Sequence, residues 1–213
     1  MEQPTDPFAD ALRGEDALRA LYGEPDSRAW RKDIGHLDRH CRALVAASPM
    51  VVVGSFDAEG RCDVTPRGGP PGFVSVLDDR RLIIPDATGN RRLDTLCNVI
   101  TTGRVGLLFL IPGRDTTLRV NGRACVTAAA EILDAVTPVG KRPVTAVVVE
   151  AQEVYAHCPK AFVRSGLWDP DTWPAKDALP SSAQIMRDHL DDAGLTVEDV
   201  EARERDALLH RLR

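Results

Sequence analysis

Between residues 50 and 155 the sequence consists of short runs rich in β-branched residues, separated by turn residues. The first run, 50–56, is followed by Asp-Ala-Glu-Gly at 57–60, a pattern typical of a hairpin turn. Only one short helix, at about 91–98, is expected to interrupt the series. Many short strands at even spacing predict a β-barrel. The predicted strands are 50–56, 62–66, 72–77, 81–85, 104–110, 117–128 and 144–155.

Helical patterns flank the predicted barrel on both sides. Residues 10–22 resemble a short helix, and Ser27 is a candidate N-cap for a longer one ending near Ala47. Further helices are predicted near 181–193 and 196–211. The fold class is therefore mainly β with flanking helices. We expect a single domain over 1–213, composed of N-terminal helices at 1–48, a barrel at 49–156 and a C-terminal helical segment at 157–213.

Composition limits the partners that this chain can have. With 213 residues and 43% hydrophobic content the chain can bury one sizeable core. Its formal net charge of -5 argues against nucleic-acid binding, which needs a concentrated positive field. No apolar run approaches the roughly 20 residues needed to span a bilayer, and 1–10 is polar and acidic, so we expect a cytoplasmic protein without membrane contact. The five cysteines form no CxxC pair, which predicts neither a disulfide framework nor a metal site.

A buried strand that leads through a glycine turn into a helix, at 83–96, is the most informative segment. Asn90 is a good candidate N-cap, and it would place Arg91 and Arg92 in the first helical turn. Cations are unfavourable there because the N-terminal end of the helix dipole is positive, and a bound anion would reverse that. Backbone N–H groups and guanidinium groups together favour a phosphate. The alternative is that both arginines are solvated, or that Arg91 pairs with Asp94 or Thr95.

Two other segments could border a ligand. The loop at 63–73 is so rich in Gly and Pro that it cannot continue a strand ladder, and it would let backbone approach a flat ligand. It could equally be a rigid connection with Arg67 exposed. In the strand at 117–124, alternation places Thr117, Arg119 and Asn121 on one face. That face could line a cleft or be an ordinary solvent-facing surface.

Weaker signals lie toward the C-terminus and in the first helices. Lys160 and Arg164 would share one face of a short helix, where they could bind an anionic substrate or a partner's flavin, or form a charged rim. His36 and His40 have the helical spacing of a metal-binding pair, but no accompanying motif supports a metal site. Trp173 is interpreted as a loop anchor, whereas Trp168 could be an anchor or could cover a ligand ring.

The motifs occur in a characteristic order along most of the chain. The first motifs are Leu-Tyr-Gly-Glu-Pro at 21–25, and Asp-Val-Thr-Pro-Arg-Gly at 63–68 with Pro-Pro-Gly-Phe at 70–73. They are followed by Ile-Pro-Asp at 84–86 with Gly-Asn-Arg-Arg-Leu-Asp at 89–94, and by Gly-Leu-Leu-Phe-Leu-Ile-Pro-Gly at 106–113. The last are Thr-Leu-Arg-Val-Asn-Gly at 117–122 and His-Cys-Pro-Lys-Ala at 157–161. In this series the chain resembles the pyridoxamine 5'-phosphate oxidase-related, FMN-binding split-barrel proteins, in particular the branch described as FMN-dependent enzymes.

The resemblance implies a homodimer with two FMN molecules at the subunit interface. It implies that Arg91 and Arg92 hold the phosphate, that backbone at 64–67 and 85–86 borders the isoalloxazine, and that Thr117, assisted by Arg119, contacts the cofactor. The full set of candidate cofactor-binding residues is Val64, Thr65, Arg67, Pro85, Asp86, Asn90, Arg91, Arg92, Thr117, Arg119, Lys160 and Arg164.

Two departures limit what the resemblance implies about the substrate. Gly69 stands where related sequences of the branch often carry an acidic residue, and the C-terminal Trp and Arg pattern of true pyridoxamine phosphate oxidases is missing. We therefore expect an FMN-binding oxidoreductase that acts on an unidentified small molecule, not a vitamin B6 oxidase. The sequence identifies no catalytic residue, and none is required in principle because the cofactor supplies the redox chemistry. The alternatives are a non-enzymatic flavin- or heme-binding protein, or an F420-dependent reductase, on the same fold.

Overall fold

A computed structural model describes residues 6, 8–87, 89–136, 138–192 and 194–210. The chain forms two compact units, residues 1–33 and residues 34–213. The first unit contains α1 (Glu15–Tyr22) and α2 (Ser27–Arg31). Asp26 caps α2 by accepting a hydrogen bond from the Arg28 N–H, so Ser27 is the first helical residue and the prediction that it is the N-cap is wrong. The expectation of a single domain, composed of helices at 1–48, a barrel at 49–156 and a helical segment at 157–213, stays a prediction.

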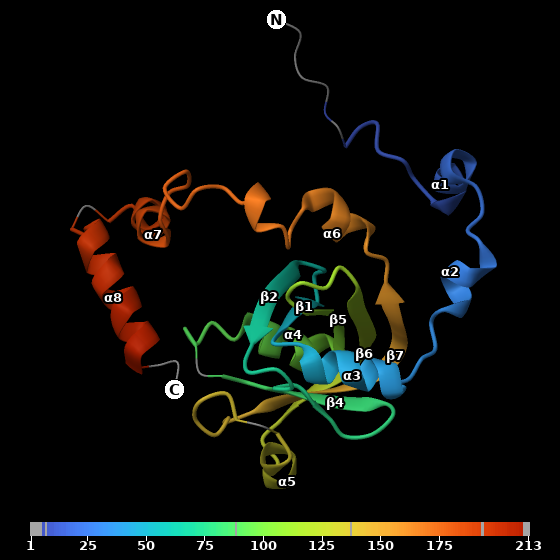
Figure 1. Cartoon of the computed structure of the whole chain (residues 1–213), viewed down its shortest axis with the longest axis horizontal. Helices are drawn as coiled ribbons and strands as arrows, with labels where there is room; N and C mark the ends of the chain where they lie inside the picture. Colours follow the sequence, from blue (N-terminus) through green and yellow to red (C-terminus); the bar gives the residue numbers. More distant parts are fainter. Residues whose placement is uncertain (1–5, 7, 88, 137, 193, 211–213) are drawn as a thin grey trace, which may run out of the picture. The chain divides into compact units, whose positions relative to one another are not determined.

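The second unit is built on one seven-stranded sheet in which every neighbouring pair is antiparallel. Its spatial order is β2-β1-β5-β6-β7-β4-β3 (Figure 1). Burial alternates along β1 and β5, because one face of each strand packs on the core. The strands are β1 (Met50–Phe56), β2 (Cys62–Gly68), β3 (Ser75–Val76), β4 (Arg81–Pro85), β5 (Arg104–Leu110), β6 (Thr117–Thr127) and β7 (Ala146–His157).

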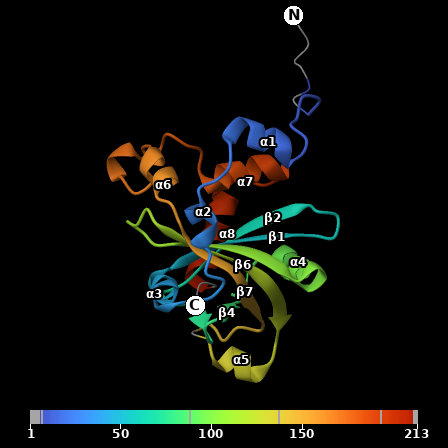
Figure 2. The same ribbon diagram turned by 90° about the vertical axis from the view of Figure 1, so that its right-hand side faces the viewer.

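The long strands β6 and β7 form the central pair of the sheet. They curve together between α6 (Lys160–Ser165) at one end and α5 (Ala130–Asp134) at the other (Figure 2). The register shifts between Asn121 and Gly122, where a β-bulge interrupts the ladder. A Cβ at Gly122 would overlap the carbonyl oxygen of Glu150, so the bulge requires glycine. The expectation of only one helix within the strand series is wrong, because α5 also lies between two strands.

Two helices enclose the core of the second unit. α3 (Arg39–Ala47) packs against β3, β6 and β7, and α4 (Asp94–Thr102) packs against β1, β2, β5 and β6. The main core combines their apolar faces with the inner faces of the strands. The largest fully buried side chains are Phe73, Phe109, Leu37, Leu82, Ile83, Leu107 and Leu118.

The predicted long helix from Ser27 to Ala47 is wrong, because residues 32–38 are not helical. Gly35 adopts a left-handed φ of 63°, and Asp38 then caps α3 by accepting hydrogen bonds from the His40 and Cys41 N–H groups. The Cys41 hydrogen bond holds the pKa of Asp38 below its usual value. The helical spacing of apolar residues continues through this break, but α2 ends at Arg31 and the Asp38 cap starts α3.

The C-terminal part follows β7 through α6, a 3-10 turn at Pro170–Thr172, α7 (Ser182–Leu190) and α8 (Val197–His210). Ser181 and Gln184 form a reciprocal capping box that starts α7. α7 and α8 pack on each other, which buries Ala183 and Val200. Within the described ranges, no helix is both long and apolar enough to cross a membrane.

Candidate functional site

The loop between β4 and α4 and the edge strand β2 enclose a cavity of about 500 Å³, here called the loop cavity. This volume is in the range of small-molecule and cofactor sites. Many predicted residues meet in it although they come from segments about 20 to 30 residues apart. The predicted cofactor residues that line it are Val64, Thr65, Arg67, Asp86, Asn90, Arg91 and Arg92.

The turn before α4 has an unusual backbone. Arg91 and Leu93 adopt left-handed φ values of 64° and 62°, which cost energy for residues other than glycine. The side chain of Asn90 accepts a hydrogen bond from the Arg92 N–H at 3.0 Å, and α4 begins only at Asp94. Two predictions are therefore wrong: Asn90 is not the N-cap, and the arginines precede the helix instead of occupying its first turn. The Asn90 hydrogen bond closes a tight turn, and that turn delays the helix.

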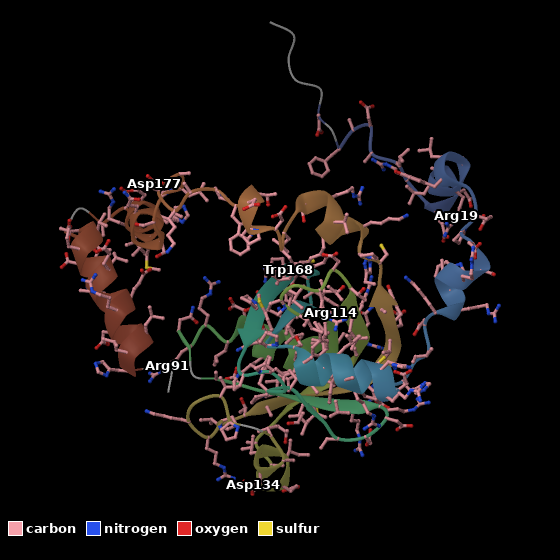
Figure 3. All side chains as sticks on the ribbon, viewed as in Figure 1. Arg19, Arg91, Arg114, Asp134, Trp168 and Asp177 are labelled. Atoms are coloured by element: carbon pink, nitrogen blue, oxygen red, sulfur yellow. The ribbon has the colours of Figure 1, made fainter. Side chains whose placement is uncertain are left out.

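The two arginines differ in their partners. The Arg92 Nε lies 2.8 Å from the Asp94 carboxylate, in an exposed pair. Arg91, labelled in Figure 3 on the loop between β4 and α4, has no carboxylate partner among the described residues. Asp94 therefore pairs with Arg92, and not with Arg91 as in the alternative drawn from the sequence. An exposed ion pair contributes only about 0–1 kcal/mol, so a phosphate could replace Asp94 at Arg92 at little cost.

An ion pair joins two strands that lie far apart in the sheet order. The Arg67 Nη1, at the end of β2, lies 2.9 Å from the Asp86 carboxylate, which follows β4. Both side chains are largely buried. Pro85 ends β4, where it pairs with Ala146, and it is buried and does not line the loop cavity. The Arg67–Asp86 pair therefore links the end of β2 to the end of β4, next to the turn at 90–93.

A polar cluster that the sequence analysis did not identify anchors α4 to the sheet. The Asp63 carboxylate accepts hydrogen bonds from the Thr95 hydroxyl at 2.7 Å and the Ser55 hydroxyl at 3.3 Å. The Asn98 side-chain amide donates to the Ser55 hydroxyl at 3.0 Å. Ser55, Thr95 and Asn98 are buried. Alternation places Asp63 on the same strand face as Arg67, which was the available signal, but its partners on α4 could not be inferred from spacing.

Thr117 and Arg119 line a different cavity of about 400 Å³, here called the sheet cavity, on the sheet face opposite the core. Val64 lines both cavities, so they adjoin at β2. The Arg119 guanidinium carbon lies 5.6 Å from the centre of the Tyr155 ring. Thr117 is buried and pairs with His157 across the β6–β7 ladder. The predicted cofactor residues are thus divided between two neighbouring cavities.

The remaining candidates lie on and after α6. Lys160 and Arg164 are exposed, line neither cavity, and are linked by a hydrogen bond from the Arg164 Nε to the Lys160 carbonyl oxygen. The Trp168 Nε1–H donates to the Arg114 carbonyl oxygen at 2.9 Å, and the two residues lie side by side in Figure 3. The Trp168 ring stacks on Phe162 at a centroid distance of 6.0 Å. Because Phe162 lines the sheet cavity, Trp168 supports one of its walls.

Trp173 makes a local contact, with its Nε1–H donating to the Leu167 carbonyl oxygen, although the side chain is exposed. His36 and His40 do not face a common ligand position. The His36 ring lies 2.7 Å from the Ile34 carbonyl oxygen, and the His40 ring accepts a hydrogen bond from Arg39. Within the part of the chain that the structure describes, no group of three His, Cys, Asp or Glu residues could hold a metal ion.

Known structures similar to the chain come from several bacteria. HupZ of Group A Streptococcus is 16% identical, with a TM-score of 0.47 over 56% of this chain and 92% of that one. A Lactobacillus delbrueckii protein provisionally named as a pyridoxamine 5'-phosphate oxidase is 22% identical, with a TM-score of 0.46 over 58% and 98%. HutZ, the heme storage protein from Vibrio cholerae, is 10% identical, with a TM-score of 0.39 over 57% and 93%. None of the curated proteins matches the chain significantly.

A family profile described as pyridoxamine 5'-phosphate oxidase matches residues 37–158, which is more than half of the chain. The match begins just before α3 and ends just after β7, so it contains the whole sheet and both cavities except for the α6 residues. The predicted fold class, mainly β with flanking helices in a split barrel, is confirmed. The chain belongs to the pyridoxamine 5'-phosphate oxidase family.

Proposed function

We propose that the protein binds FMN in the loop cavity and acts as an oxidoreductase on a small molecule. The observation that carries this proposal is the turn at 90–93, just before α4, where a left-handed backbone presents Arg91 with no carboxylate partner among the residues that the structure describes. Backbone N–H groups at a helix start and a free guanidinium suit a phosphate. Residues with such a backbone cluster at active sites and ligand-binding sites.

The residues of the loop cavity fit the rest of the cofactor. Val64 and Thr65 on β2 and Asp86 after β4 provide an adjoining wall for a flat ring, and the Arg67–Asp86 ion pair fixes the separation of the two strands. Bound FMN would supply the electron-transfer chemistry, and the protein would bind, orient and shield the reacting ring. The proposal includes a homodimer, with Lys160 and Arg164 as further contacts to the cofactor, whereas Thr117 and Arg119 line the adjoining sheet cavity.

Comparing FMN with riboflavin tests the phosphate site, since riboflavin has the same ring without the phosphate. We expect wild-type protein to bind FMN at least about 100-fold more tightly, because charge-assisted hydrogen bonds contribute about 1.5–3 kcal/mol each. The double variant Arg91→Gln/Arg92→Gln should lose most of this preference. Titration of ligand-free protein, followed by flavin fluorescence, measures both affinities.

Arg61→Gln is the matched control, because Arg61 is exposed and paired with Asp57 on a hairpin outside the loop cavity. Equal affinities of the wild-type protein for FMN and riboflavin would refute the phosphate site. Parallel titrations with F420 and heme test the alternative cofactors. Anaerobic bleaching of the bound flavin by NAD(P)H would support an enzyme, and a flavin that no nicotinamide or small-molecule donor reduces would refute one.

A further inference from the structure

The sheet cavity has a composition different from that of the loop cavity. Its walls are apolar, with Val52 and Leu108 from the sheet and Phe162 from α6. Its polar lining residues, which are Thr117, Arg119, Asn121 and His157, lie on the adjacent strands β6 and β7. A volume of about 400 Å³ suits a small organic molecule.

The charge of Arg119 lacks a carboxylate counterpart within ion-pair distance among the described residues. Its Nε makes only a long hydrogen bond, 3.5 Å, to the Asn121 side-chain oxygen, and its guanidinium lies over the Tyr155 ring. Glu153, the neighbouring acid on β7, instead accepts a hydrogen bond from the Asn121 amide at 2.7 Å. A half-buried guanidinium beside apolar walls favours a bound anion, because desolvation strengthens the attraction between the two charges.

The apolar lining of the sheet cavity is suited to a ring. Phe162 stacks on Trp168, and the hydrogen bond from Trp168 to the Arg114 carbonyl oxygen holds this aromatic pair against the loop between β5 and β6. His157 stacks on Tyr155, with 6.3 Å between ring centres. Aromatic and aliphatic walls on a supported frame favour a flat apolar body.

We propose that the sheet cavity binds a small aromatic carboxylic acid, with the carboxylate on Arg119 and the ring against Phe162, as the substrate class of this protein. The assignment as substrate rests on the proposed function, because the sheet cavity meets the loop cavity at Val64. The binding site itself is formed by residues of β1, β2, β5, β6, β7 and α6.

Isothermal titration calorimetry with benzoate, benzamide and acetate tests the site in the FMN-free and FMN-loaded protein. Benzamide keeps the ring without the charge, and acetate keeps the charge without the ring. We expect benzoate to bind at least about tenfold more tightly than either. Arg119→Gln should abolish the preference for benzoate over benzamide. Equal binding of benzoate and benzamide by the wild-type protein, or no binding, would overturn the proposal.

Two further variants separate the site from general effects of mutation. Arg123→Gln removes a charge from the same strand outside the sheet cavity, where Arg123 pairs with Glu150 at 3.3 Å, and it should retain the preference. Phe162→Leu should weaken benzoate and leave acetate unchanged. A preference that persists in Arg119→Gln would contradict the assignment of the anion to Arg119.

The two cofactor states distinguish this inference from the proposed function. If benzoate binds equally to FMN-free and FMN-loaded protein, the sheet cavity is separate from the cofactor, as proposed. If saturating FMN displaces benzoate, Arg119 faces the cofactor and the substrate assignment falls, while the proposed function stands. If the protein does not bind FMN, the proposed function falls, and the benzoate titration of the FMN-free protein still decides the anion site.

Discussion

At the scale of single residues, the cysteines show how burial decides reactivity. Cys41 lies in the main core on α3, whereas Cys62, Cys97, Cys125 and Cys158 are exposed. Burial, together with the nearby Asp38 carboxylate, raises the pKa of the Cys41 thiol to about 11. The thiolate is the reactive form, so Cys41 should be inert in the folded protein.

We predict that a thiol reagent at pH 8 modifies Cys41 at least about 100-fold more slowly than the exposed cysteines, because its thiolate fraction is lower and its access is blocked. Counting modified thiols in native and denatured protein, with Cys41→Ser as the reference, measures this. Native wild-type protein and native Cys41→Ser should give the same rapid count, and the wild-type protein should gain one thiol on denaturation. If one more thiol reacted rapidly in the native wild-type protein than in native Cys41→Ser, the prediction would be contradicted.

Other features at the residue scale depend on neighbours far along the chain. The sequence marks Arg67, Asp86 and Arg91 as functional candidates, and all three reach the loop cavity. It does not predict that Arg67 pairs with Asp86, nor that Arg92 instead of Arg91 pairs with Asp94. Partner choice depends on side-chain directions set by the left-handed residues in the turn, and periodicity carries no information about them.

At the scale of elements, the β6–β7 pair depends on its bulge. The bulge at Asn121 and Gly122 lets the two longest strands curve, and it brings Gly122 against the backbone of Glu150. By contrast, a Cβ at Gly54 on β1 would be 3.7 Å from the nearest atom, which is an ordinary contact. The two glycines therefore differ in how much they constrain the sheet.

We predict that Gly122→Ala lowers the free energy of unfolding by about 2 kcal/mol or more, since the new methyl group overlaps a backbone carbonyl that cannot rotate away. Gly54→Ala, the matched control on another central strand, should change it by less than about 1 kcal/mol. Urea unfolding followed by circular dichroism gives both values. Similar losses in the two variants would show that the bulge does not require glycine.

At the scale of the whole molecule, the core and the C-terminal helices are separate in their packing. The buried apolar clusters found among the described residues draw their members from 37–154, whereas α7 and α8 bury Ala183 and Val200. The family match, 37–158, ends at the same boundary. The sheet should therefore keep its stability without the last two helices.

We predict that a chain ending at residue 178 folds with a thermal midpoint within about 5 °C of the full chain, because no member of either core cluster is removed. FMN titration of the truncated chain should give an unchanged affinity, since the loop cavity is lined only by residues before 146. Differential scanning calorimetry measures the midpoint. Loss of the folding transition would show that the C-terminal helices stabilise the sheet.

The sequence by itself determined most of the strands, because runs of β-branched residues bounded by turn residues are a local signal of strand structure. It also determined the family and the segments that form the loop cavity. Only the tertiary structure decided where α4 begins, which arginine remains unpaired, and that Asp63 joins Thr95 across 32 residues of sequence. These contacts form between side chains brought together by folding, so no local pattern could specify them.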